Sequence, residues 1–354
     1  MKFINYLMVA GLLVLTSCHK DDEDEIIVQN FDTTIVYKYN ASFVIENQTE
    51  ITEDICPDYL KSGDKVAICA ASNSVTEANV SAGKSKLESW GLQVVEAENL
   101  YKVDGRYAGT LADRIQGFQK MIDDPEIKAI FFARGGYGAA QILPYVNWTK
   151  FKQHPKWIIG YSDVTAIHIA LNNMGYESII GPMMNGFTKD AQSVTDLKNA
   201  LFGNIVNYTF SSNENCINGE AAGRLVGGNL SLIYSLSGTA FDLNTINSIL
   251  FIEDTGEANY SIDRMLLNLQ QSGKLEYIKG VIVGEFINTT QGSDLSIPEI
   301  MKKYFGDKGI PVMYGFPNGH DTRNNPLILG NYVYLSVTDS EAKLNFNLNA
   351  ATAK

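Results

Sequence analysis

Residues that mark several protein classes are scarce in this sequence. Only four of its 354 residues are cysteine, so the chain is not a disulfide scaffold of the kind that stabilises small secreted domains. Basic residues are outnumbered, with 28 lysines and arginines against 40 aspartates and glutamates and a formal net charge of −12. A chain with this charge has no general attraction to nucleic acid or to anionic lipid, and we expect no nucleic-acid partner.

Motifs that hold metals and nucleotides are also missing. The sequence contains neither H-E-x-x-H nor paired cysteine motifs, so a zinc hydrolase is not expected. It also lacks G-x-G-x-x-G and G-x-x-x-x-G-K-[ST], which leaves a nucleotide site with little support. We therefore predict a function that needs neither a metal nor an organic cofactor.

The N-terminus has the pattern of an export signal. A basic residue, Lys2, precedes a short apolar stretch at Tyr6–Leu15, which is far shorter than the roughly 20 residues that span a bilayer. The stretch runs into Leu15-Thr16-Ser17-Cys18, which resembles the lipobox of bacterial lipoproteins, where the chain is cut before the cysteine and the cysteine is acylated. The alternative is an ordinary secretory signal with an accidental cysteine.

The lipobox interpretation predicts a signal peptide at 1–17 and lipid attachment at Cys18. Lipid on this cysteine anchors a protein without any transmembrane helix, so we expect a lipid-anchored protein exported to the bacterial cell envelope. Its contact with the membrane is then made through this lipid alone. The acidic segment 18–50 is interpreted as a tether that contains at most one edge strand.

The rest of the chain has the composition of a globular protein, with 45% hydrophobic residues. Between residues 51 and 200, apolar strand patterns alternate with amphipathic helix patterns, which predicts a doubly wound, parallel α/β domain. The pattern weakens after Gly186, and we interpret 201–218 as a connection to a second, mixed α/β domain at 219–354. The predicted strands of the first domain are 65–70, 92–95, 127–132 and 157–159; predicted helices are 76–90, 111–123 and 164–174, followed in the second domain by 230–236 and 262–271.

Two loops of the first domain carry unusual residues, RGGYG (134–138) and GYSDVT (160–165). Both follow predicted strands, and ligands of doubly wound sheets bind beyond the carboxyl ends of the strands. Ser162 stands where a buried strand turns into a helix, a position typical of a nucleophile. A serine that only caps the helix is the more common alternative. The stretch is not the G-x-S-x-G motif, because Val164 replaces the second glycine.

A serine nucleophile needs a base, which is usually histidine. Of the four histidines, His320 follows a glycine in a loop and is the best candidate, whereas His168 lies within a predicted helix and is expected to be structural. The other two lie in polar segments, at 19 and 154. Glu253 ends an apolar stretch and is the candidate to hold the base, with a solvated strand end as the alternative.

Backbone amides near Ser162 are candidates to bind an oxyanion. Acyl transfer develops a negatively charged oxygen, and glycines allow backbone N–H groups to approach it closely. The pair Gly135–Gly136 supplies one candidate donor and Asp163 the other. A phosphate cradle is the alternative interpretation of the glycines.

Together these segments resemble the serine peptidases of family S66, the LD-carboxypeptidases (muramoyltetrapeptide carboxypeptidases). The resemblance extends over residues 57–340 in the same order. It assigns the family's nucleophile to Ser162, its glutamate to Glu253 and its histidine to His320, and it matches the glycine pair to the oxyanion loop, where we favour Gly136. The other matching segments are LKSGDKVAI (60–68), GPM (181–183), GGNL (227–230), IED (252–254), YSIDR (260–264), GEF (284–286) and GH (319–320).

The resemblance implies a flavodoxin-like N-terminal domain and a smaller C-terminal domain, with the site between them. It also implies metal-free cleavage of an L,D peptide bond that releases terminal D-alanine from a murein tetrapeptide. The resemblance also implies that the protein forms a homodimer. Two alternatives stay open: an S66 hydrolase of another peptide or of an aminoacyl-nucleotide, and a non-catalytic, lipid-anchored binding protein for peptidoglycan fragments.

Overall fold

The computed structural model describes residues 48–204 and 206–346, together with the backbone of four short strands nearer the N-terminus. Within this described part of the chain, no helix combines the length and the apolar character needed to cross a membrane. Cys18 lies outside the described residues. The four N-terminal strands form an antiparallel sheet and are β1 (Tyr6–Val9), β2 (Leu12–Leu15), β3 (Glu25–Asn30) and β4 (Thr33–Lys38).

The segment predicted as a tether therefore differs from the expectation. It contains two paired strands, β3 and β4, where the sequence analysis allows at most one. Both strands are rich in β-branched residues, which favour the extended backbone.

The first large sheet has the strand order β15-β9-β8-β7-β5-β6. From β6 to β9 the neighbouring strands run parallel, and this 2-1-3-4-5 order is that of flavodoxin-like, doubly wound sheets, which confirms the predicted fold class. β15 comes from far along the chain and pairs with β9 in the antiparallel direction. The strands are β5 (Lys65–Cys69), β6 (Gln93–Glu96), β7 (Ile127–Phe132), β8 (Trp157–Gly160), β9 (Ser178–Ile180) and β15 (Leu327–Leu329).

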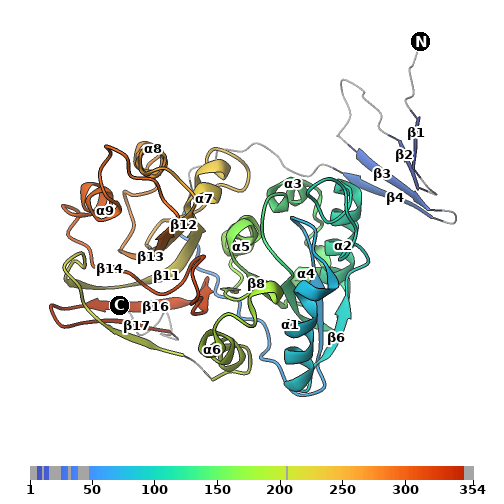
Figure 1. Cartoon of the computed structure of the whole chain (residues 1–354), viewed down its shortest axis with the longest axis horizontal. Coiled ribbons are helices and arrows are strands. Elements are labelled where there is room, and N and C mark those ends of the chain that lie inside the picture. The colour runs from blue at the N-terminus through green and yellow to red at the C-terminus, as the bar shows by residue number, and fades with distance from the viewer. Residues whose placement is uncertain are drawn as a thin grey trace, which may run out of the picture.

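Helices pack around this sheet (Figure 1) and bury its central strands. Every residue of β8 is buried. This agrees with its uninterrupted apolar sequence, which is typical of a strand covered on both faces. The helices are α1 (Glu77–Ser89), α2 (Leu111–Asp123), α3 (Ala139–Ile142), α4 (Thr149–Gln153), α5 (Thr165–Asn173) and α6 (Ala191–Leu201).

The second large sheet has the order β10-β17-β16-β11-β12-β13-β14. Strands β11 to β14 run parallel, whereas β16, β17 and β10 extend the sheet in antiparallel fashion, so the second domain is mixed α/β, as predicted. Its strands are β10 (Tyr208–Ser211), β11 (Gly219–Asn229), β12 (Ser248–Thr255), β13 (Gly280–Ile287), β14 (Val312–Tyr314), β16 (Tyr332–Val337) and β17 (Glu341–Asn345), and its helices are α7 (Leu230–Leu236), α8 (Asn259–Gln271) and α9 (Ile297–Phe305).

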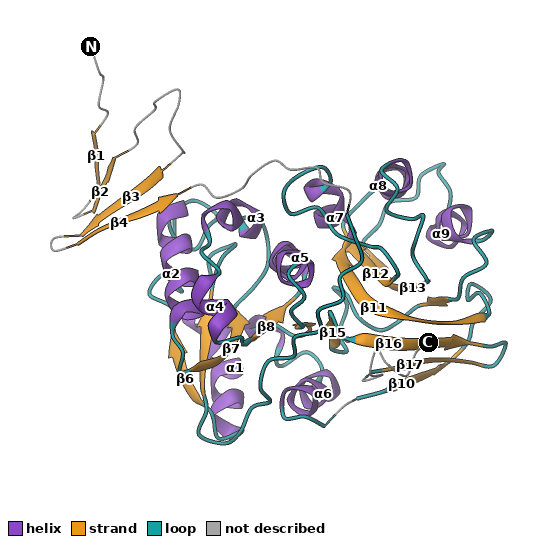
Figure 2. Cartoon of the chain, turned by 180° about the vertical axis from the view of Figure 1, so that it is seen from behind, coloured by secondary structure: helices purple, strands orange, loops and turns teal. Residues whose placement is uncertain are grey.

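The two domains lie side by side, and α5 contacts α7 and β11 where they meet (Figure 2). Gly228 has φ +138°, and a Cβ atom there would lie 2.6 Å from Oγ1 of Thr165, so only glycine allows this close approach. The next backbone amide, that of Asn229, donates to the same oxygen at 3.0 Å. These contacts bring the carboxyl end of β11 to the start of α5, three residues after Ser162.

The sequence analysis misses several elements, among them the helices α6 and α9 and the strand β10. α6 lies in the stretch where the pattern weakens, and α9 was not expected either. The short β10 lies within 201–218 and forms an edge of the second sheet, so this segment does more than connect the domains. By contrast, the predicted helices 111–123 and 230–236 match α2 and α7 residue for residue.

Candidate active site

Ser162 occupies a strained turn at the carboxyl end of β8. A 3-10 turn at Ser162–Val164 leads directly into α5, and the backbone of Ser162 has φ +61°, a value that residues other than glycine rarely adopt. Ser162 is not the N-cap of either helical segment, since Tyr161 precedes the 3-10 turn and Val164 precedes α5 in the N-cap positions. A serine held in this way at a sharp strand-to-helix turn presents its hydroxyl at the ligand-binding edge of the sheet.

The glycine loop after β7 lies against this serine. A Cβ atom on Gly135 would lie 3.2 Å from Oγ of Ser162 and 3.5 Å from the amide nitrogen of Asp163, whereas the same position on Gly136 is filled by the side chain of Asn73. Within 48–204 and 206–346, the amides of Gly135, Gly136 and Asp163 donate to no other group. Backbone donors therefore remain available beside the serine hydroxyl.

The carboxylate of Asp163 ties the loops around Ser162 together. It is fully buried, and its Oδ2 accepts hydrogen bonds from Oγ of Ser72 at 2.5 Å and from the amide of Ala139 at 2.8 Å. Burial raises the pKa of Asp163, although these two hydrogen bonds and nearby arginines oppose the rise. Ser72 follows β5 and Ala139 begins α3, so one side chain joins three neighbouring loops.

His320 and Glu253 form a hydrogen-bonded pair in the second domain. Nδ1 of His320 lies 2.8 Å from Oε2 of Glu253, which is 1% exposed on β12. Gly319 has φ +155°, and a Cβ atom there would lie 3.3 Å from that carboxylate oxygen, so glycine lets the histidine loop come close. The contact that the sequence analysis predicts between this base and this acid is present.

Glu253 and its neighbour shape the electrostatics of the histidine. Burial alone would lower the pKa of His320, but its hydrogen bond to Glu253 and the charges of Glu253 and Asp254 outweigh this effect, so the pKa is raised. The positive charge of Lys189 acts in the opposite direction. Burial, with the charge of Glu253, raises the pKa of Asp254 to about 6. The site therefore stabilises an imidazolium.

Tyr161 connects the two halves of the site. Its ring packs edge-on against the imidazole of His320, with centroids 5.0 Å apart, and the next residue in the chain is Ser162. Burial raises the pKa of this phenol to about 12, with a contribution from the charge of Glu253. In the described structure no hydrogen bond joins Ser162 to His320. Unliganded catalytic contacts are often longer than those in a substrate complex.

The other histidines are placed elsewhere. His168 is fully buried in α5, between Oγ of Ser178 and the carbonyl of Gly160, both at 2.9 Å. Burial lowers its pKa to about 4, so it is the structural residue that the sequence predicts. His154 is exposed at the end of α4, and His19 lies outside the described residues.

One polar residue near the pair, Asn229, was not singled out from the sequence as a site residue. Asn229 donates its side-chain amide to Glu253 and Asp254, at 3.2 and 3.0 Å. Its place after two glycines and directly before a helix was the available signal, because asparagine is a common helix cap. Among the described residues no group of three or more His, Cys, Asp or Glu side chains is arranged to hold a metal ion.

Comparisons with known proteins show the family of the chain. Residues 66–181 match the LD-carboxypeptidase N-terminal domain, and residues 222–335 match the LD-carboxypeptidase C-terminal domain. A protein of Bacillus subtilis (strain 168), named probable murein peptide carboxypeptidase, is 30% identical over 308 residues, which cover 84% of this chain and 97% of that protein. The chain belongs to the S66 family of LD-carboxypeptidases.

Solved structures of S66 proteins share the fold. The muramoyltetrapeptide carboxypeptidase of Oxalobacter formigenes superimposes with a TM-score of 0.73 at 23% identity, covering 80% of this chain and 99% of its own. The microcin C7 self-immunity protein MccF, in complex with aspartyl sulfamoyl adenosine, gives a TM-score of 0.74 at 22% identity and covers 82% of this chain and 98% of its own. Membership of S66 makes the chain a serine-type peptidase, and its two-domain architecture is that of the family.

Proposed function

We propose that this S66 peptidase cleaves an L,D peptide bond and releases the terminal D-alanine of a murein tetrapeptide. The observation that carries the proposal is the 2.8 Å hydrogen bond between Nδ1 of His320 and the buried carboxylate of Glu253, beside the strained turn at Ser162. A histidine held through Nδ1 has Nε2 free to accept a proton from a nucleophile. A protein that only binds peptidoglycan fragments has no need of such a pair.

The proposed reaction proceeds through an ester on Ser162. Nε2 of His320 takes the hydroxyl proton while Oγ attacks the carbonyl carbon at the L-centre of the third stem-peptide residue. His320 then gives this proton to the nitrogen of D-alanine, and the C–N bond breaks. Water next loses a proton to His320 and adds to the ester; the bond to Oγ breaks, and the proton returns to Ser162. Glu253 fixes the tautomer and stabilises the imidazolium.

Backbone amides are proposed to bind the oxyanion of both tetrahedral intermediates. The candidates are those of Gly136 and Asp163, because both amides are unused among the described residues and both lie in the loops around Ser162. Preorganised donors of this kind stabilise charge that develops in the transition state and cost no reorganisation when it forms. None of these steps requires a metal ion.

The substrate class is inferred from the relatives. A probable murein peptide carboxypeptidase is similar in sequence, and a muramoyltetrapeptide carboxypeptidase is similar in fold, which favours a murein peptide. MccF has the same fold, so an aminoacyl-nucleotide is the second substrate class to test.

A panel of substrates tests the proposal. The purified protein is incubated with a murein tetrapeptide, with the same peptide ending in L-alanine, and with aspartyl sulfamoyl adenosine, each with and without a chelator. We expect mass spectrometry to find tripeptide and D-alanine from the first substrate alone, at the same rate with the chelator. Cleavage confined to the aminoacyl-nucleotide would replace the murein assignment, and cleavage that stops with the chelator would contradict the metal-free mechanism.

We also propose that the protein is exported and anchored by lipid at Cys18 after removal of residues 1–17, and that it forms a homodimer. The support for the anchor is the lipobox-like sequence before this cysteine. In a bacterial host fed labelled palmitate, the wild-type protein should carry label and sediment with membranes, and Cys18→Ala should do neither. Equal labelling of both proteins would contradict the anchor.

The homodimer is tested separately. Light scattering should give the mass of a dimer, and the mass of a monomer would contradict this part of the proposal.

A further inference from the structure

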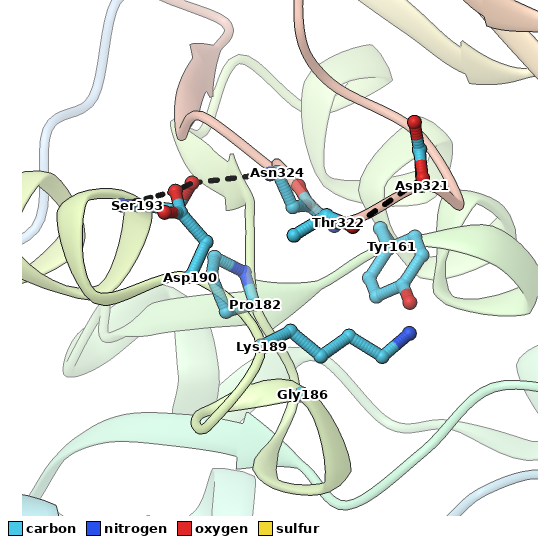
Figure 3. Close-up of a pocket in the computed structure, with 9 residues that line it drawn as sticks. All are labelled: Tyr161, Pro182, Gly186, Lys189, Asp190, Ser193, Asp321, Thr322 and Asn324. Carbon is cyan, nitrogen blue, oxygen red and sulfur yellow. Dashed lines mark hydrogen bonds between the residues drawn. The ribbon is translucent and has the colours of Figure 1, made fainter.

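A small recess is lined by residues of the loops after β8 and β9 and of the loop that follows His320 (Figure 3). Its wall includes Tyr161, which precedes the serine, and Asp321, which follows the histidine. Tyr161 also packs against the imidazole of His320, so the recess borders the His320 side of the site. In the proposed reaction this is the side of the departing amino acid, because His320 delivers a proton to its nitrogen.

Lys189 contributes the positive charge of this recess. It is exposed on the loop between β9 and α6, and its side chain extends along the recess toward the Tyr161 hydroxyl (Figure 3). Within the described ranges it forms no ion pair and donates no side-chain hydrogen bond. The charge is close enough to His320 to oppose the rise of the histidine pKa.

The adjacent carboxylate does not neutralise Lys189. Oδ2 of Asp190 accepts hydrogen bonds from the amide of Ser193 at 2.9 Å and from its hydroxyl at 2.6 Å, as the N-cap of α6. The positive charge that acts most on Asp190 is that of Arg323. Lys189 thus forms no ion pair within the described residues, although the carboxylates of Asp190 and Asp321 also line the recess.

We propose that Lys189 binds the terminal carboxylate of the substrate and so selects peptides cut at their last residue. This inference rests on the proposed function. The terminal carboxylate is one α-carbon away from the scissile nitrogen, and consecutive α-carbons are only about 3.8 Å apart, so it must lie close to His320. An ammonium group forms strong, charge-assisted hydrogen bonds with a carboxylate. A longer peptide offers a neutral amide at this position and gains much less.

Lys189→Met tests the proposal, because methionine keeps most of the side-chain length and removes the charge. The substrates are a murein tetrapeptide with a free terminal carboxylate and the same peptide with a terminal amide. For the free acid we expect kcat/KM to fall by about 10- to 100-fold, mainly through KM, as for loss of a charged hydrogen bond. For the amide we expect little change, so the preference for the acid disappears. Lys189→Arg should retain most of the preference.

The matched control is Lys152→Met, at an exposed lysine of α4, a helix that precedes β8, whereas Ser162 follows this strand. It should leave both rates unchanged. If Lys189→Met lowers both rates equally, the role of Lys189 is structural; if it lowers neither, Lys189 has no role in binding. In both cases the preference for the acid is unchanged, and the inference about Lys189 is overturned while the proposed function stands. If the wild-type protein cleaves neither peptide, the proposed function fails and the inference fails with it.

Discussion

Asn229 donates its side-chain amide to Oε1 of Glu253 at 3.2 Å. Its own Oδ1 accepts from the amide of Leu232 at 3.3 Å, as the N-cap of α7. Because its backbone amide also donates to Thr165 at 3.0 Å, this residue links the carboxylate behind His320 to the helix that begins after the serine. The geometry of the pair therefore depends on how the two domains meet.

Replacing Asn229 should uncouple this link. Asn229→Ser keeps a helix cap but is too short to reach Glu253, and a buried carboxylate oxygen is left unpaired. We expect the free energy of unfolding to fall by about 1–3 kcal/mol and kcat to fall by about tenfold, with little change in KM, since the substrate contacts are intact. Thermal denaturation and steady-state kinetics measure both. A variant with wild-type kcat would show that Asn229 does not position Glu253.

The raised pKa of His320 predicts the pH dependence of activity. Because the base must be neutral, kcat/KM should fall as the pH drops through a value above the ordinary 6.5. Glu253→Gln removes the main cause of the rise, so the acid limb should move to lower pH while the rate falls by roughly 10³-fold or more. An acid limb that stays in place would contradict the assignment of this limb to His320.

The same pair makes stability depend on pH. A group whose pKa is raised on folding stabilises the protein fully below its unfolded pKa, and this contribution is lost as the pH rises through the folded value. Glu253→Gln should therefore destabilise the protein more at about pH 5 than at about pH 9, as measured by denaturant unfolding. The exposed Glu88→Gln is the control. A destabilisation that grows toward high pH would have the wrong sign for this pair.

Because the backbone at Ser162 is strained, we expect a substitution that relieves the strain to raise stability while it removes activity. A residue other than glycine at φ +61° stores about 1–3 kcal/mol, and glycine removes this strain at an entropic cost of about 0.5–1 kcal/mol. Ser162→Gly should therefore raise the free energy of unfolding by about 1 kcal/mol and abolish activity. A clear loss of stability in this variant would show that the turn is not strained.

Much of the fold follows from local patterns in the sequence. The amphipathic spacing in 111–123 and the apolar run at 230–236 predict α2 and α7 because their signals lie within the elements themselves. α6 has the same kind of signal, with Asp190 as its cap and Val194, Leu197 and Leu201 buried at helical spacing. It was missed because polar residues surround these positions. β15 could not be predicted, since its place depends on pairing with β9, about 150 residues earlier in the chain.

The candidate site was predictable only in part. The sequence indicates that Ser162, Glu253 and His320 lie at loop and strand ends, and the resemblance to S66 peptidases assigns them to one site. The positive φ of Ser162, the hydrogen bonds of Asp163 to two other loops and the place of Lys189 near His320 were not visible. They arise from contacts between segments distant in sequence, which no local pattern encodes.

The most direct test of the account is the rate at which D-alanine leaves a murein tetrapeptide with the wild-type protein and with Ser162→Ala. The wild-type protein should release D-alanine, and Ser162→Ala should do so at least about 10³-fold more slowly while it stays folded. The control His154→Asn, at the exposed residue that follows α4, should match the wild type. Release by Ser162→Ala within tenfold of the wild-type rate would contradict the central claim that this serine is the nucleophile.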